Sequence, residues 1–161
     1  MRALKVENYG DAPILVDCDI PKPAKGELLV RIAACGLNFA DLLMIQGRYQ
    51  ERPPLPVTLG MELAGTVEAA GPGTDAALVG QRVAVFAGSG GLADYACVPA
   101  GRCVPLPDSM SFEEAAAFQV AYGTSHVALE HKARLQPGET LLVTGAAGGV
   151  GLTAVEMGKL M

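Results

Sequence analysis

Short runs of apolar residues, separated by glycine, proline and charged residues, dominate the first hundred or so positions of the chain. Runs of this length between turn residues predict β-strands. One short helix is predicted at Phe39–Ile45, after the turn Gly36-Leu37-Asn38. Many short strands, few helical patterns, 20 glycines and 11 prolines indicate a compact barrel or sandwich. The predicted strands are Arg2–Val6, Ile14–Val16, Leu28–Ala34, Leu63–Ala69, Arg82–Phe86, Tyr95–Pro99 and Cys103–Leu106.

The pattern changes after Pro107, where helical signals replace short strands. Ser111 and Glu114 have the spacing of a capping box, so a helix is expected to continue over Ala115–Phe118. A second helix is predicted from about Gly123 to Ala133, followed by a strand at Thr140–Thr144 and a last helix from about Gly149. This change predicts two domains, residues 1–115 and residues 116–161, with the boundary in the region 108–122.

A glycine-rich turn joins the last predicted strand to the last predicted helix. Gly145 suits the tight exit from the strand, Gly148 and Gly149 permit close approach of a phosphate, and Gly151 lets the helix pack closely. The backbone N–H groups around Gly149 and Val150 then face an anion, aided by the helix dipole. Strand, glycine turn and helix together predict a seat for a nucleotide pyrophosphate. The alternative is a turn that binds no ligand.

Composition and charge exclude several classes of protein. Half of the 161 residues are hydrophobic and 18% are charged, which excludes a disordered chain. The net charge is −5 without a basic cluster, which argues against nucleic acid as a partner. No apolar run is long enough to span a bilayer, and Met1–Glu7 lacks the apolar core of a signal peptide. The four cysteines, without metal-ligand spacing, predict reduced thiols in a cytoplasmic protein.

A second group of polar residues follows the strand Leu28–Ala34 and comprises Asn38, Asp41 and Tyr49. Such side chains at a strand end and helix start can line a cleft, because they offer donors, acceptors and a phenol. The alternative is structural: Asn38 caps the short helix and Asp41 lies in its first turn. His126 and His131, the only histidines, lie in a helical stretch and favour packing or surface roles.

Four segments together resemble the medium-chain dehydrogenase/reductase superfamily, in the order in which that superfamily carries them. They are Ala33–Asp41, Gly60-Met61-Glu62-Leu63-Ala64-Gly65, Ala121-Tyr122-Gly123-Thr124-Ser125 and Gly145–Gly151. The branch that they resemble is that of the zinc-free quinone oxidoreductases related to zeta-crystallin. The resemblance implies a mainly β chain: a GroES-like, partly open barrel followed by the first βα unit of a Rossmann-type α/β domain.

The resemblance also implies a reaction, namely hydride transfer from NADPH to a quinone or another conjugated carbonyl acceptor. Residues matching Asn38, Asp41 and Tyr49 line the catalytic cleft in that branch. Asn38 and Tyr49 orient the acceptor carbonyl or the nicotinamide ribose, and Thr124 lies near the nicotinamide end. Cofactor contacts are therefore expected at Asn38, Thr124, Gly145, Gly148, Gly149, Val150 and Gly151.

No metal is expected, because Asn38 and Met61 stand where zinc enzymes of the superfamily carry cysteine and histidine. Glu62, beside the lost histidine, is expected to have a structural role. Two other functions stay open: reduction of enoyl thioesters, and a non-catalytic structural or binding role.

Only ten residues follow Gly151, whereas the residue that reads the cofactor ribose comes about 20 residues after such glycines. Relatives in the resembled family are considerably longer. The sequence therefore predicts an N-terminal fragment that is inactive by itself. A single parallel strand leaves both of its edges and its apolar faces uncovered. We expect weak or absent NADPH binding by the fragment and a homodimer that covers this surface.

Overall fold

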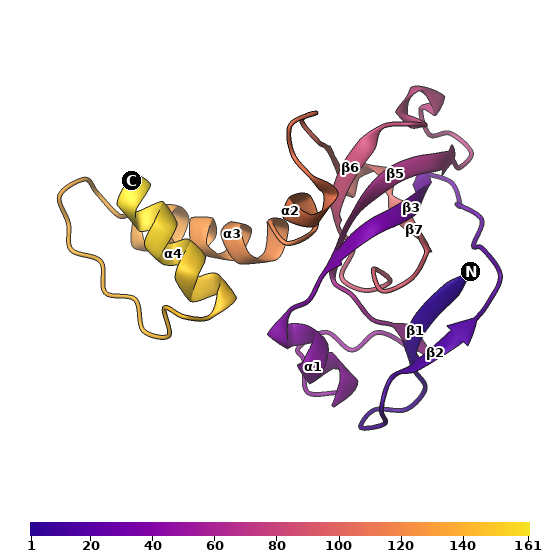
Figure 1. The fold of residues 1–161 in the computed structure, drawn as a ribbon, viewed down its shortest axis with the longest axis horizontal. Helices are drawn as coiled ribbons and strands as arrows, with labels where there is room; N and C mark the ends of the chain where they lie inside the picture. Colours follow the sequence, from indigo (N-terminus) through magenta and orange to yellow (C-terminus); the bar gives the residue numbers. More distant parts are fainter. The chain divides into compact units, whose positions relative to one another are not determined.

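A computed structural model describes all 161 residues of the chain. Their contacts divide the chain into two compact units, Met1–Ala117 and Phe118–Met161. The first unit carries all of the β-structure, and the second is helical apart from its loops (Figure 1).

The N-terminal unit contains two antiparallel sheets that do not close into one barrel. The smaller sheet has the strand order β2-β1-β4, and the larger has the order β7-β3-β5-β6-β8. All seven strands that the sequence predicted in this unit are present within a few residues of their expected bounds. The strands are β1 Arg2–Val6, β2 Ile14–Asp17, β3 Glu27–Gly36, β4 Val57–Thr58, β5 Glu62–Ala70, β6 Arg82–Phe86, β7 Tyr95–Pro99 and β8 Cys103–Pro105.

Alternation of side chains along these strands places an apolar core on one face of the larger sheet. Leu28 and Val30 of β3 are fully buried there, together with apolar residues of β5, β6 and β7. The other face is covered by helix α2 (Phe112–Ala116), whose Ala115 and Ala116 pack on Ala64 of β5. The core cluster consists of Leu28, Val30, Leu63, Val67, Val83, Val85, Ala96 and Val98.

Helix α2 begins with the capping box that the sequence predicted. The Ser111 hydroxyl accepts a hydrogen bond from the Glu114 backbone N–H at 3.1 Å, and the Ser111 N–H donates to the Glu114 carboxylate at 2.9 Å. These bonds satisfy two backbone groups that a helix leaves unpaired at its start. They lower the pKa of Glu114, and the first cause is the hydrogen bond from the Ser111 backbone.

Replacing Ser111 with alanine is expected to destabilise the N-terminal unit by about 1 kcal/mol, because the cap acceptor is lost. Chemical denaturation at neutral pH measures the change. Ser109→Ala, two residues earlier and equally exposed, is the matched control and should change the free energy of unfolding far less. Equal losses in the two variants would refute the capping role.

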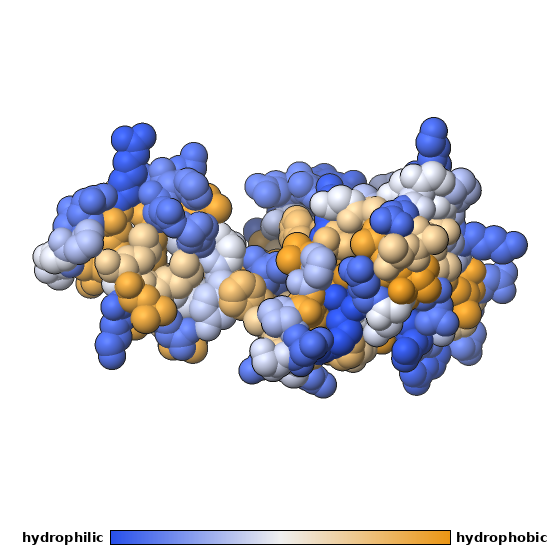
Figure 2. All heavy atoms as spheres, turned by 90° about the horizontal axis from the view of Figure 1, so that it is seen from above, coloured by the Kyte–Doolittle hydropathy of each residue, from blue (hydrophilic) through white to orange (hydrophobic).

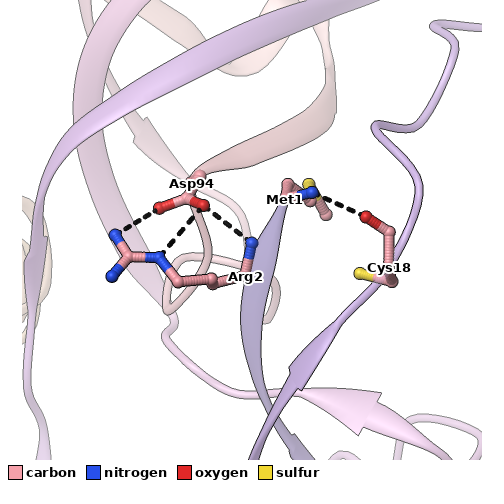
Figure 3. Close-up of polar contacts among 4 residues, drawn as sticks. All are labelled: Met1, Arg2, Cys18 and Asp94. Atoms are coloured by element: carbon pink, nitrogen blue, oxygen red, sulfur yellow. Dashed lines mark hydrogen bonds and ion pairs between the residues drawn. The ribbon is translucent and has the colours of Figure 1, made fainter.

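The N-terminus is fastened to the rest of its unit by polar contacts (Figure 3). The Arg2 backbone N–H donates to Asp94 at 2.7 Å, and its guanidinium forms an ion pair with the same carboxylate at 3.1 Å. The Met1 ammonium donates to the Cys18 carbonyl at 2.7 Å. The Arg2 backbone bond, followed by its side-chain bond, holds the pKa of Asp94 below its usual range. The Arg2 contacts tie β1 to the loop before β7, and the Met1 contact ties it to the residue after β2.

The C-terminal unit pairs helix α3 (Gln119–His126) with helix α4 (Gly149–Leu160). Ser125 of α3 is 1% exposed, and its hydroxyl donates to the Val150 carbonyl at 2.9 Å. The Thr153 hydroxyl lies 2.8 Å from that of Ser125 and donates back to the Ala121 carbonyl at 3.1 Å. This buried network joins the two helices, which lie side by side in Figure 1.

Two predictions for this unit need correction. No strand forms at Thr140–Thr144: residues 140–143 have no regular secondary structure, and Thr144 begins a turn. A parallel strand is held by neighbours on its edges, and no other strand occurs in this unit. The helix predicted from Gly123 begins four residues earlier, at Gln119, and continues as a π-helical segment over Val127–Ala133 (η3). The last helix begins at Gly149, as predicted.

Large apolar side chains reach the surface of the C-terminal unit. Leu142 and Leu160 are 86% and 87% exposed, and Val150, Leu152 and Val155 are also exposed. Hydrophobic atoms are correspondingly visible on the surface in Figure 2. Within the chain, these side chains lack the burial that gives most apolar residues their stabilising effect. No helix of the chain has the length and apolarity required to cross a membrane.

Candidate functional site

Three consecutive residues, Gly60-Met61-Glu62, connect the polar residues that the sequence placed in a catalytic cleft. The Gly60 backbone N–H donates to Asp41 Oδ1 at 3.1 Å. Asn38 Nδ2 donates to Glu62 Oε1 at 2.8 Å. Met61 is 2% exposed in an apolar cluster against which Tyr49 packs. The structure therefore brings Asn38, Asp41 and Tyr49 to one end of strand β5.

Asp41 is buried beneath the site and stabilises it through hydrogen bonds to the backbone. It is 5% exposed, and the Asn38 backbone N–H donates to its second carboxylate oxygen at 2.8 Å. With Gly60 on the first oxygen, both oxygens already accept backbone hydrogen bonds. A buried carboxylate of this kind needs such donors to offset its lost hydration. Asp41 thus anchors the loop that carries Asn38, and its place in the catalytic cleft stays a prediction.

Asn38 stands where the structural interpretation of the sequence placed it, at the start of the short helix. It occupies the N-cap position of helix α1 (Phe39–Ile45), in a capping box with Asp41. Its amide nevertheless leaves the helix and donates to Glu62, a carboxylate that is 2% exposed on β5. Asn38 itself is half-buried and remains reachable from outside. The cap fixes the backbone of Asn38, and Glu62 fixes its amide.

Tyr49 presents a different chemistry. Its half-buried ring packs on the apolar cluster of Val6, Met44, Val57, Leu59 and Met61. Its hydroxyl forms no hydrogen bond with another residue of the chain. A phenol with an anchored ring and an available hydroxyl can donate a hydrogen bond to a bound oxygen.

The Cys35 thiol lies near Asp41 and Glu62 of this site and has low reactivity. Burial raises its pKa to about 12, and the nearby carboxylates of Asp41 and Glu62 contribute to the rise. Because the thiolate is the nucleophile, a thiol with so high a pKa reacts slowly at neutral pH. The structure assigns Cys35 to packing.

Iodoacetamide is expected to label Cys35 at pH 8.5 at least about tenfold more slowly in the folded chain than in urea. In the unfolded chain the pKa returns toward 9.0, so a larger fraction is thiolate. The same difference lowers the stability of the folded state as the pH rises from 9 toward 12, because only the unfolded chain loses the proton. Mass spectrometry of labelled peptides gives the two rates, and equal rates would contradict the burial of the thiol.

A polar cavity of about 290 Å³ opens at the same end of the sheet. Its lining includes Arg52 and Arg102, and neither guanidinium forms an ion pair within the chain. Strand β6 links the cavity to the site, because Phe86 pairs with Glu62 and the Ala87 N–H donates to the Met61 carbonyl. Sequence reasoning missed this pair, since 50 positions separate the two arginines and only the fold brings them together.

The glycines of the turn differ in whether the fold itself requires a glycine at that position. Gly145 has a φ of +72°, and a Cβ at Gly151 would overlap the Gly145 carbonyl oxygen, so the chain itself requires both. Gly148 and Gly149 have no such requirement: a Cβ at Gly149 would meet nothing within 4 Å. Both are exposed at the start of α4, where backbone N–H groups point outward. The surface at Gly149 is open and leaves its backbone accessible to a ligand.

Thr124 belongs to the same unit as the glycine turn. It is exposed on α3, and the neighbouring Ser125 donates to the carbonyl of Val150, the second residue of α4. The helix that carries Thr124 is therefore fixed to the helix that the glycine turn opens. Asn38, Asp41 and Tyr49 belong to the N-terminal unit, and the glycine residues to the C-terminal unit.

Comparisons with known proteins agree on one family. The alcohol dehydrogenase GroES-like domain matches residues 24–108. The human synaptic vesicle membrane protein VAT-1 homolog is 48% identical over 85% of this chain and 35% of its own length. The quinone oxidoreductase of Thermus thermophilus, solved also with NADPH, is 40% identical with a TM-score of 0.88, covering all of this chain and 50% of that one. CurK enoyl reductase is 31% identical with a TM-score of 0.87, over 99% of this chain and 51% of that one.

The two antiparallel sheets with α2 thus form a GroES-like domain, as the sequence resemblance implied. The chain belongs to the medium-chain dehydrogenase/reductase superfamily, in its quinone oxidoreductase-like branch. It spans about a third to a half of the length of the relatives that it matches.

Proposed function

We propose that this chain carries the catalytic domain, residues 1–115, and the beginning of the nucleotide-binding domain, residues 116–161, of an NADPH-dependent quinone reductase. The observation that carries the proposal is the joining of Asn38, Asp41 and Tyr49 by Gly60-Met61-Glu62. The NADPH complex of the Thermus relative and the open surface at Gly149 support the cofactor.

Each candidate residue has a proposed role in binding or reaction. The N–H groups at the start of α4 bind the pyrophosphate, and Gly148 and Gly149 leave room for it. Asn38 and Tyr49 hydrogen-bond to the acceptor carbonyl or to the nicotinamide ribose, and Thr124 borders the nicotinamide. Bound NADPH supplies the hydride. Tyr49 or water supplies the proton, and the protein contributes mainly position and polarity.

The reaction is proposed to proceed without zinc. Asn38 and Met61 occupy the places where the zinc enzymes carry ligands, and a thioether inside an apolar cluster is a poor zinc ligand. Addition of a chelator should therefore leave turnover unchanged.

The experiment uses protein expressed from the complete reading frame. NADPH oxidation at 340 nm is followed with 1,4-naphthoquinone and, in parallel, with crotonyl-CoA. The proposal expects faster turnover of the quinone. Turnover of crotonyl-CoA alone would move the function to enoyl-thioester reduction, and turnover of neither would favour a non-catalytic role.

Enoyl-thioester reduction is the second candidate, and the arginine pair at the polar cavity favours it. Arg52 and Arg102 are without carboxylate partners, and two guanidiniums can bind the phosphates of a CoA thioester. CurK enoyl reductase has the same fold over this chain.

The Arg52→Gln and Arg102→Gln double variant tests the second candidate. If the cavity binds a CoA phosphate, KM for crotonyl-CoA should rise about tenfold or more, while KM for naphthoquinone stays within about twofold. Arg31→Gln, an exposed arginine elsewhere on the larger sheet, is the control. An unchanged KM for crotonyl-CoA would remove the cavity from substrate binding.

The assembly is proposed to be a homodimer, because large apolar side chains of the C-terminal unit are uncovered. Light scattering coupled to gel filtration measures the molar mass of the protein in solution. A monomeric mass at micromolar concentration would refute the proposed homodimer. The cytoplasmic location inferred from the cysteines stays a prediction.

A further inference from the structure

We infer that Glu62 is a positioning residue, which turns the Asn38 amide so that Asn38 serves the bound ligand as a hydrogen-bond donor. The inference rests on the proposed function and gives Glu62 a role beyond the structural one that the sequence suggested. The inference is drawn from the contacts of Asn38, whose side-chain amide meets Glu62 and whose backbone meets Asp41.

Glu62 determines which end of the Asn38 amide faces it. An ionised carboxylate accepts hydrogen bonds and has none to donate, so only the NH2 end of the amide can turn toward it. The observed contact is of this kind, with Asn38 Nδ2 donating to Glu62 Oε1 at 2.8 Å. Hydrogen bonds to an ionised partner are also stronger than those between neutral groups. The opposite orientation would place the amide oxygen against a carboxylate and is strongly disfavoured.

The backbone holds the other side of Asn38. Asp41 accepts the Asn38 N–H at 2.8 Å, and the Asp41 N–H donates to the Asn38 backbone carbonyl at 3.0 Å. These two bonds fix the backbone of Asn38, and one hydrogen of its side-chain amide is directed toward Glu62. The second amide hydrogen is left for a ligand, because an amide nitrogen carries two. A carbonyl oxygen or a ribose hydroxyl of the ligand can accept it.

Glu62 itself has little freedom to move. It is 2% exposed and pairs with Gly36 across the β3–β5 ladder. A Cβ at Gly36 would lie 2.7 Å from Glu62 Oε1 and would overlap the Ala116 carbonyl. The absence of a side chain at Gly36 therefore makes the space in which the Glu62 carboxylate lies. Such packing lets a positioning residue hold a catalytic group in one geometry.

A double-mutant cycle on protein from the complete reading frame tests the inference. Glu62→Gln keeps the shape but lets the facing group donate as well as accept, so kcat for naphthoquinone should fall about tenfold with KM for NADPH within about twofold. In the Asn38→Ala background, Glu62→Gln should have no further effect on kcat. Glu68→Gln, on the exposed part of the same strand, is the matched control.

Nuclear magnetic resonance of the Asn38 side-chain amide in the 161-residue chain gives a readout that is independent of activity. One amide proton should exchange slowly with solvent, and Glu62→Gln should accelerate its exchange about tenfold or more. Equal kcat losses from Glu62→Gln with and without Asn38 would overturn the positioning role, as would unchanged exchange. If the unsubstituted protein reduces no quinone, the proposed reaction fails, while the exchange measurement still decides the contact.

Discussion

Replacing Gly149 with alanine is expected to weaken NADPH binding by about tenfold to hundredfold without lowering the stability of the protein. A Cβ at Gly149 meets nothing within 4 Å in the chain, and alanine is favoured over glycine in a helix. The methyl group instead occupies the space through which a pyrophosphate reaches the backbone. Isothermal calorimetry and thermal denaturation of protein from the complete reading frame give the two quantities.

Gly151→Ala is the informative contrast to this variant. Its Cβ would overlap the Gly145 carbonyl oxygen, so the turn must distort before any ligand binds. Stability and NADPH affinity should therefore fall together in Gly151→Ala, whereas only affinity falls in Gly149→Ala. Unchanged affinity in Gly149→Ala would show that the turn is structural and binds no nucleotide.

Replacing Asn38 with alanine is expected to lower kcat/KM for naphthoquinone by about a hundredfold, the effect of removing one well-placed donor from an active site. The variant also leaves the Glu62 carboxylate without its Asn38 donor in a buried position, so a moderate loss of stability is expected. Steady-state kinetics across a range of quinone and NADPH concentrations separates kcat from the two KM values.

Asn8→Ala is the control for Asn38→Ala, since Asn8 is exposed and its amide donates only to Asp11. It should leave kcat/KM unchanged. Asn38→Asp is a second test. Its carboxylate cannot donate a hydrogen bond to Glu62, and it places a negative charge next to that of the Glu62 carboxylate. If Asn38→Ala retained kcat/KM within about threefold, Asn38 would be a helix cap without a role in the reaction.

The strands of the larger sheet could be predicted because their apolar runs lie between strong turn signals. Strand β4 was missed, since Val57–Thr58 is only two residues long and follows a proline-rich segment. The strand expected at Thr140–Thr144 has a suitable sequence, but a strand exists only with a paired neighbour, which a local pattern cannot supply. Helix α3 was placed too late because Gln119–Tyr122 carry no start signal of their own.

The candidate site was predictable in its members and less so in their roles. Asn38, Asp41 and Tyr49 were selected from their residue types and from the resemblance. The structure moved Asp41 below the surface and joined Glu62 to Asn38, because Glu62 pairs opposite Gly36 in the β3–β5 ladder. Strand register is a tertiary property, and so is the meeting of Arg52 with Arg102 in one cavity.

The most direct test of the central claim, that the two units serve NADPH-dependent reduction of a quinone, is one stopped-flow experiment. Protein from the complete reading frame is mixed with one equivalent of NADPH and excess 1,4-naphthoquinone, and absorbance at 340 nm is recorded beside the Asn38→Ala and Gly149→Ala variants. The account predicts rapid loss of the NADPH absorbance, slowed by both substitutions. Unchanged absorbance in the unsubstituted protein, or equal rates in all three proteins, would contradict it.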